Sequence, residues 1–91
     1  MQVKIPATVS GQGRSGTLTI DVPAAATLRL VLDEIDRRYP GAAARIVDGE
    51  GRPHRYVNLY VNGDDVRHGS GVDTPVTDND EVLILPAISG G

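Results

Sequence analysis

The sequence predicts an α+β roll in which a mixed sheet of four or five strands packs against one main helix. Three observations support this prediction. The first 22 residues contain two runs of alternating apolar and polar side chains, which is typical of half-buried strands. Residues 28–38 instead place apolar side chains three and four positions apart, as in an amphipathic helix. The second half returns to strand patterns and includes the wholly apolar run 82–85, which predicts a central strand.

Two strands are predicted before the helix. Residues 2–9 and residues 17–22 both alternate, and the glycine-rich segment 10–16 between them predicts a hairpin loop. This loop contains the pattern G-x-G-x-x-G over residues 11–16. A dinucleotide site needs a helix that begins within that motif, whereas here an alternating strand follows. We therefore expect a loop and no bound cofactor.

The helix is predicted to begin after Thr27, whose hydroxyl is suited to cap the first turn. Its end is predicted at Tyr39, because Pro40 disfavours helical geometry in the residue before it. A further short helical turn is expected over residues 42–47. The apolar stripe of the main helix consists of Leu28, Val31, Leu32 and Ile35.

After a polar loop at 48–55, the alternation of residues 56–61 predicts a strand, and Asn62-Gly63 is a strong signal for a tight turn. A brief strand is expected at 66–67 and a last strand at 81–86, beside the first strand in the middle of the sheet. This order of elements is that of the β-grasp, or ubiquitin-like, arrangement. We expect residues 1–86 to form this domain and residues 87–91 to form a flexible tail.

Composition excludes several functional classes. The chain has 91 residues, 9 basic and 12 acidic side chains and only 3% aromatic residues, which disfavours nucleic-acid binding. Without cysteine there is no disulfide, thiolate metal site or cysteine nucleophile. The two histidines, His54 and His68, lack the spacing of metal ligands. No apolar run is long enough to span a membrane and no signal peptide is evident, so we expect a cytoplasmic protein.

The sequence Pro86-Ala87-Ile88-Ser89-Gly90-Gly91 directly follows the most apolar predicted strand. Glycine is common in mobile chain ends, so the two glycines are a weak signal by themselves. Five residues beyond Pro86 can nevertheless extend about 16 Å, and glycine makes the segment narrow. We expect this segment to enter a cleft in a partner enzyme and to present the Gly91 carboxylate.

The residues from Asp80 to Gly91 fit the pattern D-x-V-x-x-x-P-x-x-x-G-G. Together with the order of elements, this ending resembles the MoaD/ThiS group of ubiquitin-like sulfur carriers. The stretch from His54 to Asn62, continued by Asp65-Val66-Arg67, is more similar to the CysO branch of that group. The resemblance covers nearly the whole domain.

The resemblance implies that an E1-like, MoeZ-type enzyme uses ATP to adenylate Gly91. A sulfur donor would then displace AMP and leave a Gly91 thiocarboxylate. A downstream enzyme would take the sulfur, either a cysteine synthase or a ThiG-like synthase that makes a sulfur-containing metabolite such as a thiosugar. The chain would be a substrate and carrier with no catalytic residue and no metal of its own.

If Val82 and Ile84 face the helix, alternation turns the next side chains outward. We therefore expect a docking patch for partner enzymes on the open face of the sheet. An exposed apolar patch usually marks an interface; the alternative is that the loop 48–55 covers it. The patch consists of Tyr56, Tyr60, Leu83 and Leu85.

Three alternatives to a free sulfur carrier remain open at this point. A ubiquitin-like modifier would use the same activated Gly91 to acylate lysines of other proteins. A small subunit of molybdopterin synthase would stay bound to a large subunit. A purely structural β-grasp module would leave Gly90-Gly91 unexplained.

Overall fold

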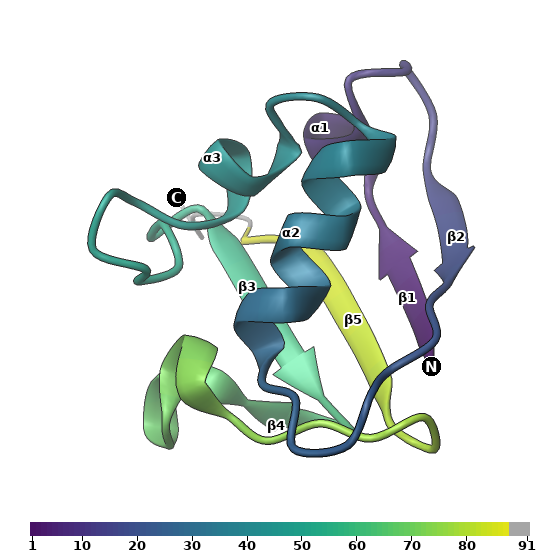
Figure 1. Ribbon diagram of the computed structural model, residues 1–91. Coiled ribbons are helices and arrows are strands. Elements are labelled where there is room, and N and C mark those ends of the chain that lie inside the picture. Colours follow the sequence, from purple (N-terminus) through teal and green to yellow (C-terminus); the bar gives the residue numbers. More distant parts are fainter. Residues whose placement is uncertain (88–91) are drawn as a thin grey trace.

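The computed structural model describes residues 1–87 and contains one five-stranded sheet with the strand order β2-β1-β5-β3-β4 (Figure 1). The main helix, α2, lies across one face of this sheet. The elements in chain order are β1 (Gln2–Ile5), α1 (Ala7–Ser10), β2 (Gly16–Thr19), α2 (Leu28–Arg38), α3 (Ala42–Ile46), β3 (Val57–Val61), β4 (Asp64–Asp65), η1 (Val66–His68), η2 (Gly71–Asp73) and β5 (Glu81–Pro86). The predicted β-grasp roll is confirmed.

The last strand occupies the centre of the sheet, as its apolar sequence predicts. β5 runs parallel to β1, with Val3 opposite Val82, and antiparallel to β3, with Leu59 opposite Ile84. β1 also pairs antiparallel with β2. The first and last strands are thus neighbours, as the sequence predicts.

The core lies between the sheet and α2 because each strand turns alternate side chains toward the helix. Val57, Leu59 and Val61 of β3 are buried, whereas Asn58 and Tyr60 are only half-buried. The four residues of the predicted helical stripe are all buried on α2. None of the helices in the described part of the chain is long and apolar enough to span a bilayer.

The prediction of a strand over residues 2–9 is wrong beyond Ile5. Pro6 has no N–H to donate to a strand partner, and its carbonyl instead accepts the N–H groups of Val9 and Ser10 at 3.0 and 3.1 Å. Residues 7–10 consequently form the short helix α1. Val9 is still buried there, because a single helical turn can also point it into the core.

Four further expectations need correction. The strand predicted over 17–22 is β2, which ends at Thr19. The short strand after the Asn62-Gly63 turn is at residues 64–65, and the predicted position 66–67 forms the 3₁₀ turn η1, which buries Val66. The strand predicted over 56–61 begins one residue later, at Val57. Thr27 does precede α2, but its hydroxyl makes no capping bond. The first N–H of the helix, that of Leu28, donates to the Thr74 carbonyl at 2.9 Å.

Candidate site at the open sheet face and the end of β5

The sheet face that α2 leaves open carries one continuous row of side chains. Register places Thr17 opposite Lys4, Lys4 opposite Leu83, Leu83 opposite Tyr60, and Tyr60 opposite Asp65. The row crosses all five strands. Its apolar members lie on β5 and β3, the central strand and its neighbour, and its charged members lie to either side.

Three residues of the predicted docking patch gather on this face. Leu83 and Tyr60 are direct cross-strand partners and half-buried, and Leu85 is 41% exposed further along β5. A hollow of about 340 Å³ lies beside the two leucines; it is bounded across β1 and β2 by Lys4 and Gly16, among others. The geometry of these three residues matches the expectation, while their role in docking stays a prediction.

Tyr56 lies apart from the other three. It is in the turn before β3, is 56% exposed, and its ring stacks on that of His54 with centroids 5.0 Å apart and planes 5° from parallel. The His54 Nε2 atom is 2.8 Å from the Ala44 carbonyl of α3. Tyr56 therefore flanks the end of β5 where the sheet meets α3, while Tyr60 belongs to the open face itself.

The tail begins from a fixed backbone contact. The N–H of Ala87 donates to the Tyr56 carbonyl at 2.7 Å, which continues the β3–β5 pairing one residue beyond Pro86. Of the six residues expected to enter a partner enzyme, the structure describes these first two. Ile88, Ser89, Gly90 and Gly91, the predicted attachment residue, lie outside the described residues.

Arg67 of η1 holds the segment around Tyr56, a role that the sequence did not reveal. Its Nη2 donates to the carbonyls of His54 and Val57, the latter at 2.6 Å, and its Nη1 donates to Asn58 Oδ1 at 3.2 Å. The Asp65 side chain accepts the Arg67 N–H at 2.8 Å and so fixes the turn that carries this arginine. The only sequence signal was the position of Arg67 within the stretch that resembles the CysO branch.

The loop 48–55 does not cover the open face. A Cβ atom added at Gly51 would meet Val72 and Arg29, which places the loop beside α2 and η2. Its own turn is closed by the Asp48 carboxylate, which accepts the backbone N–H groups of Arg52 and Glu50. These two hydrogen bonds, first that of Arg52, lower the pKa of Asp48 below its usual value. At the edge of the patch the loop contacts only Tyr56, through the stacked ring of His54, and Gly51 lies away from the open face.

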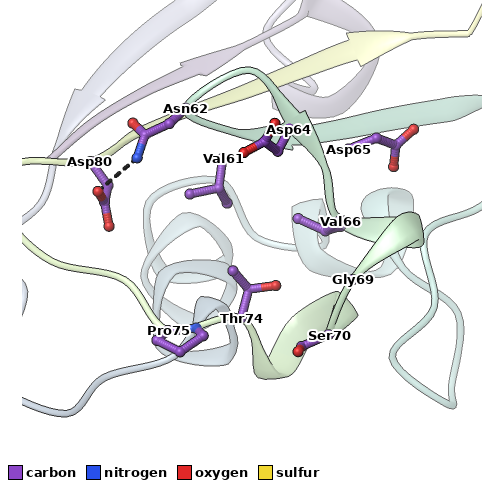
Figure 2. Close-up of a pocket in the computed structure, with 10 residues that line it drawn as sticks. All are labelled: Val61, Asn62, Asp64, Asp65, Val66, Gly69, Ser70, Thr74, Pro75 and Asp80. Carbon is purple, nitrogen blue, oxygen red and sulfur yellow. Dashed lines mark hydrogen bonds between the residues drawn. The ribbon is translucent and has the colours of Figure 1, made fainter.

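A second hollow, of about 310 Å³, lies at the opposite end of β5 (Figure 2). The Asn62 side chain joins the β3–β4 turn to β5 here, donating to Asp80 Oδ1 at 2.8 Å and accepting the Glu81 N–H at 2.9 Å. The bond from Asn62, followed by the Thr77 N–H, lowers the pKa of Asp80. We assign a structural role to these contacts. Glu81 lies five residues before Pro86, about 16 Å from the start of the tail along the strand.

Within residues 1–87, no group of three or more histidine, aspartate or glutamate side chains is arranged to hold a metal ion. The one lysine, Lys4, lies on the open face, where its Nζ is 3.8 Å from Glu81 Oε1. Both side chains are more than half exposed, so this pair contributes little to stability.

Comparison with known proteins agrees with this architecture. The family model described as "ThiS family" matches residues 3–91. The sulfur carrier protein CysO of Mycobacterium tuberculosis is 43% identical over 67 residues, covering 71% of this chain and 72% of its own. Small archaeal modifier protein 3 of Haloferax volcanii is 40% identical over 67 residues, covering 72% and 71%.

A solved structure extends the likeness over nearly the whole chain. It is the crystal structure of the BexX/CysO complex of Amycolatopsis orientalis, to which the chain is 36% identical with a TM-score of 0.71; the match covers 99% of this chain and 98% of the other. The resemblance to the MoaD/ThiS group and its CysO branch is thereby confirmed. With a family model matched from residue 3 to residue 91, the chain belongs to the ThiS family.

Proposed function

We propose that the chain is a sulfur carrier whose Gly91 carboxylate is adenylated by an E1-like, MoeZ-type enzyme and then converted to a thiocarboxylate. The main support is the 43% identity to a protein named as a sulfur carrier. The match to the family model reaches residue 91, so the glycine pair falls within the region shared with the family.

The proposed reaction has two steps. In the first, a Gly91 carboxylate oxygen attacks the α-phosphorus of ATP, and pyrophosphate leaves. In the second, the sulfur of hydrosulfide attacks the Gly91 carbonyl carbon, the bond to AMP breaks, and the thiocarboxylate remains. A carboxylate needs this activation because its own oxygen is a poor leaving group. The chain supplies the acyl group, and the activating enzyme supplies the catalytic residues.

The open face supplies the proposed docking surface for that enzyme. Tyr60, Leu83 and Leu85 form an apolar centre, and Tyr56 lies where the tail begins. Such a centre within a polar surround is typical of interfaces. We propose that the partner covers this patch and takes residues 86–91 into its cleft, so that docking and delivery of Gly91 occur together.

The sulfur must then pass to an enzyme that builds a carbon–sulfur bond. We propose as acceptor either a cysteine synthase that acts on an activated serine or a ThiG-like synthase. The relative from Amycolatopsis orientalis was crystallised with a partner named BexX, which supports the expectation that such carriers form complexes with other proteins.

The decisive experiment is intact-mass spectrometry after incubation with ATP, a MoeZ-type activating enzyme and sulfide. We expect the mass to rise by the difference between one sulfur and one oxygen atom. The control is the Gly91 deletion, which should stay unmodified with an unchanged circular dichroism spectrum. An unmodified full-length chain, with an enzyme that charges a related carrier in the same assay, would contradict the proposal.

A protein-modifier function is a second candidate, favoured by the 40% identity to a protein named as a small archaeal modifier. The same Gly91 adenylate would then be attacked by the amine of a target lysine. We expect isopeptide adducts that contain the C-terminal glycines in a digest of cell protein. Lys4 is the one lysine of this sequence, so Lys4→Arg would remove side-chain self-conjugates while leaving conjugates to other proteins.

A further inference from the structure

We propose that Arg67 is a positioning residue that fixes where the tail leaves the domain, acting through the Tyr56 carbonyl. The inference deepens the proposed function, because its kinetic consequence rests on the delivery of Gly91 to an activating enzyme. Its structural part concerns the hydrogen bond between Ala87 and Tyr56 and can be tested without any enzyme.

The argument begins with the direction of the backbone groups of β3. Tyr56 and Asn62 both bond to the β5 side, through Ala87 and Glu81. In an antiparallel pair, successive residues turn their N–H and C=O groups to opposite sides. The Val57 carbonyl therefore points away from β5, to the outer edge of β3. The Tyr56 carbonyl thus accepts from Ala87, and the adjacent Val57 carbonyl accepts from Arg67 on the other side of the strand.

The outer edge of β3 is not covered by a strand at this point. β4 has two residues, which pair with Tyr60 and Val61, so its ladder ends before Val57. Arg67 occupies the edge instead, and its guanidinium donates to Val57, His54 and Asn58. A planar guanidinium carries five N–H donors in fixed directions, a geometry that the smaller ammonium of lysine with its three donors does not reproduce.

Hydrogen bonds consequently fix His54 and Val57, which lie before and after Tyr56. The carbonyl of His54, two residues before it, accepts from Arg67 and also from the Val57 N–H at 3.0 Å, and the His54 N–H donates to Ile46 of α3 at 3.0 Å. The peptide that carries the Tyr56 carbonyl also carries the Val57 N–H, so it cannot rotate without breaking the bond to His54. Since the Tyr56 carbonyl is the acceptor for Ala87, Arg67 helps to hold Ala87, the last residue that the structure describes, in place.

The first test is amide hydrogen exchange measured by NMR in Arg67→Lys, which keeps the charge but not the planar group. We expect the Ala87 amide to exchange about 5- to 10-fold faster, with the Ile84 amide unchanged. The matched control is Arg52→Lys, because Arg52 lines the same surface hollow as Arg67 but forms an ion pair with Glu50. Unchanged exchange at Ala87, or equal acceleration at Ile84, would overturn the proposal.

The second test is the kinetics of thiocarboxylate formation. We expect a kcat reduced about 3- to 10-fold with an unchanged KM, because the docking patch is intact but fewer docked molecules present Gly91 correctly. An unchanged kcat, or a rise in KM alone, would overturn the positioning role. If the wild-type chain is not thiocarboxylated at all, the proposed function fails while the exchange experiment still decides on Arg67.

Asn58→Ala provides a second variant in case Arg67→Lys fails to fold. It removes one acceptor of the guanidinium, Asn58 Oδ1, and leaves the carbonyl contacts in place. We expect a smaller acceleration at Ala87, in the same direction as that of Arg67→Lys. No acceleration in a folded Asn58→Ala, combined with an unfolded Arg67→Lys, would assign Arg67 to stability alone and contradict the proposal.

Discussion

Leu83 of β5 lies directly opposite Tyr60 of β3 on the sheet face that α2 leaves open. The next residue along β5, Ile84, points to the other face and is 1% exposed. One strand therefore carries both the centre of the core and the centre of the proposed docking patch. Substitutions of inward-facing residues of this strand should affect stability, and substitutions of its outward-facing residues should affect binding to a partner.

Ile84→Ala should lower the free energy of unfolding by about 2–5 kcal/mol, because it leaves a cavity beneath α2. Leu85→Ala, one residue further and 41% exposed, should change it by less than about 0.5 kcal/mol. Urea denaturation followed by circular dichroism measures both values. Equal losses would show that the alternation of β5 does not hold in solution.

Leu85→Asp should weaken docking to the activating enzyme without unfolding the domain. A charge in an apolar contact is costly, and we expect the KM for thiocarboxylate formation to rise about 10- to 100-fold. Thr19→Asp is the matched control, since Thr19 is an exposed residue of β2 on the same sheet face. A similar rise in KM for both variants would assign the effect to general charge repulsion.

Gly63→Ala should destabilise the domain by about 1–2 kcal/mol, because the residue has a left-handed φ of +86° that alanine adopts only with strain. An added Cβ atom would meet nothing within 4 Å, so the backbone is the cause. Gly49→Ala, which has the same open surroundings without a left-handed φ, should cost less. Thermal unfolding of the two variants provides the comparison.

The ionised Asp80 carboxylate should stabilise the domain, and this stabilisation should be lost in acid. Its pKa is lowered in the folded state by the Asn62 and Thr77 hydrogen bonds, from a usual value of 3.8. The stabilisation is therefore complete above the unfolded pKa and is lost as the pH falls through the folded pKa. Wild type should be more stable than Asp80→Asn at neutral pH, and the difference should shrink below about pH 4.

The Asp80 prediction is checked by urea denaturation of both proteins between neutral pH and about pH 2. Asp33→Asn, at an exposed position of α2, serves as the control for a change in net charge. A stability difference between wild type and Asp80→Asn that persists unchanged in acid would contradict the assigned role.

The elements with a long, regular pattern could be predicted from the sequence. The stripe from Leu28 to Ile35 identifies α2, and the apolar run 82–85 identifies the central strand, because burial on one or both faces dictates these patterns directly. The segment 7–10 was predicted wrongly. The position of Val9 fits a strand or one helical turn equally well, and the alternation alone does not show that the Pro6 carbonyl accepts the N–H groups of Val9 and Ser10.

Part of the candidate site could also be predicted from the sequence. Outward positions for Leu83, Leu85 and Tyr60 follow from strand alternation, given the burial of Val82 and Ile84. The contacts of Arg67 were not predictable, because its acceptors are 9 to 13 positions away in the chain and are brought together by the fold. The proposed chemistry of Gly91 was inferred from the resemblance to a family, which rests on the pattern of residues 80–91 and the order of elements.

The central position of β5 has a consequence for synthesis of the protein. Ribosomes synthesise a chain from its first residue onward. In this sheet β5 lies between β1 and β3, and it is synthesised after both of them. A nascent or truncated chain without residues 81–86 would leave the facing edges of β1 and β3 unpaired. The complete sheet can therefore form only after β5 has been synthesised, so a chain that lacks β5 would also lack the proposed docking patch.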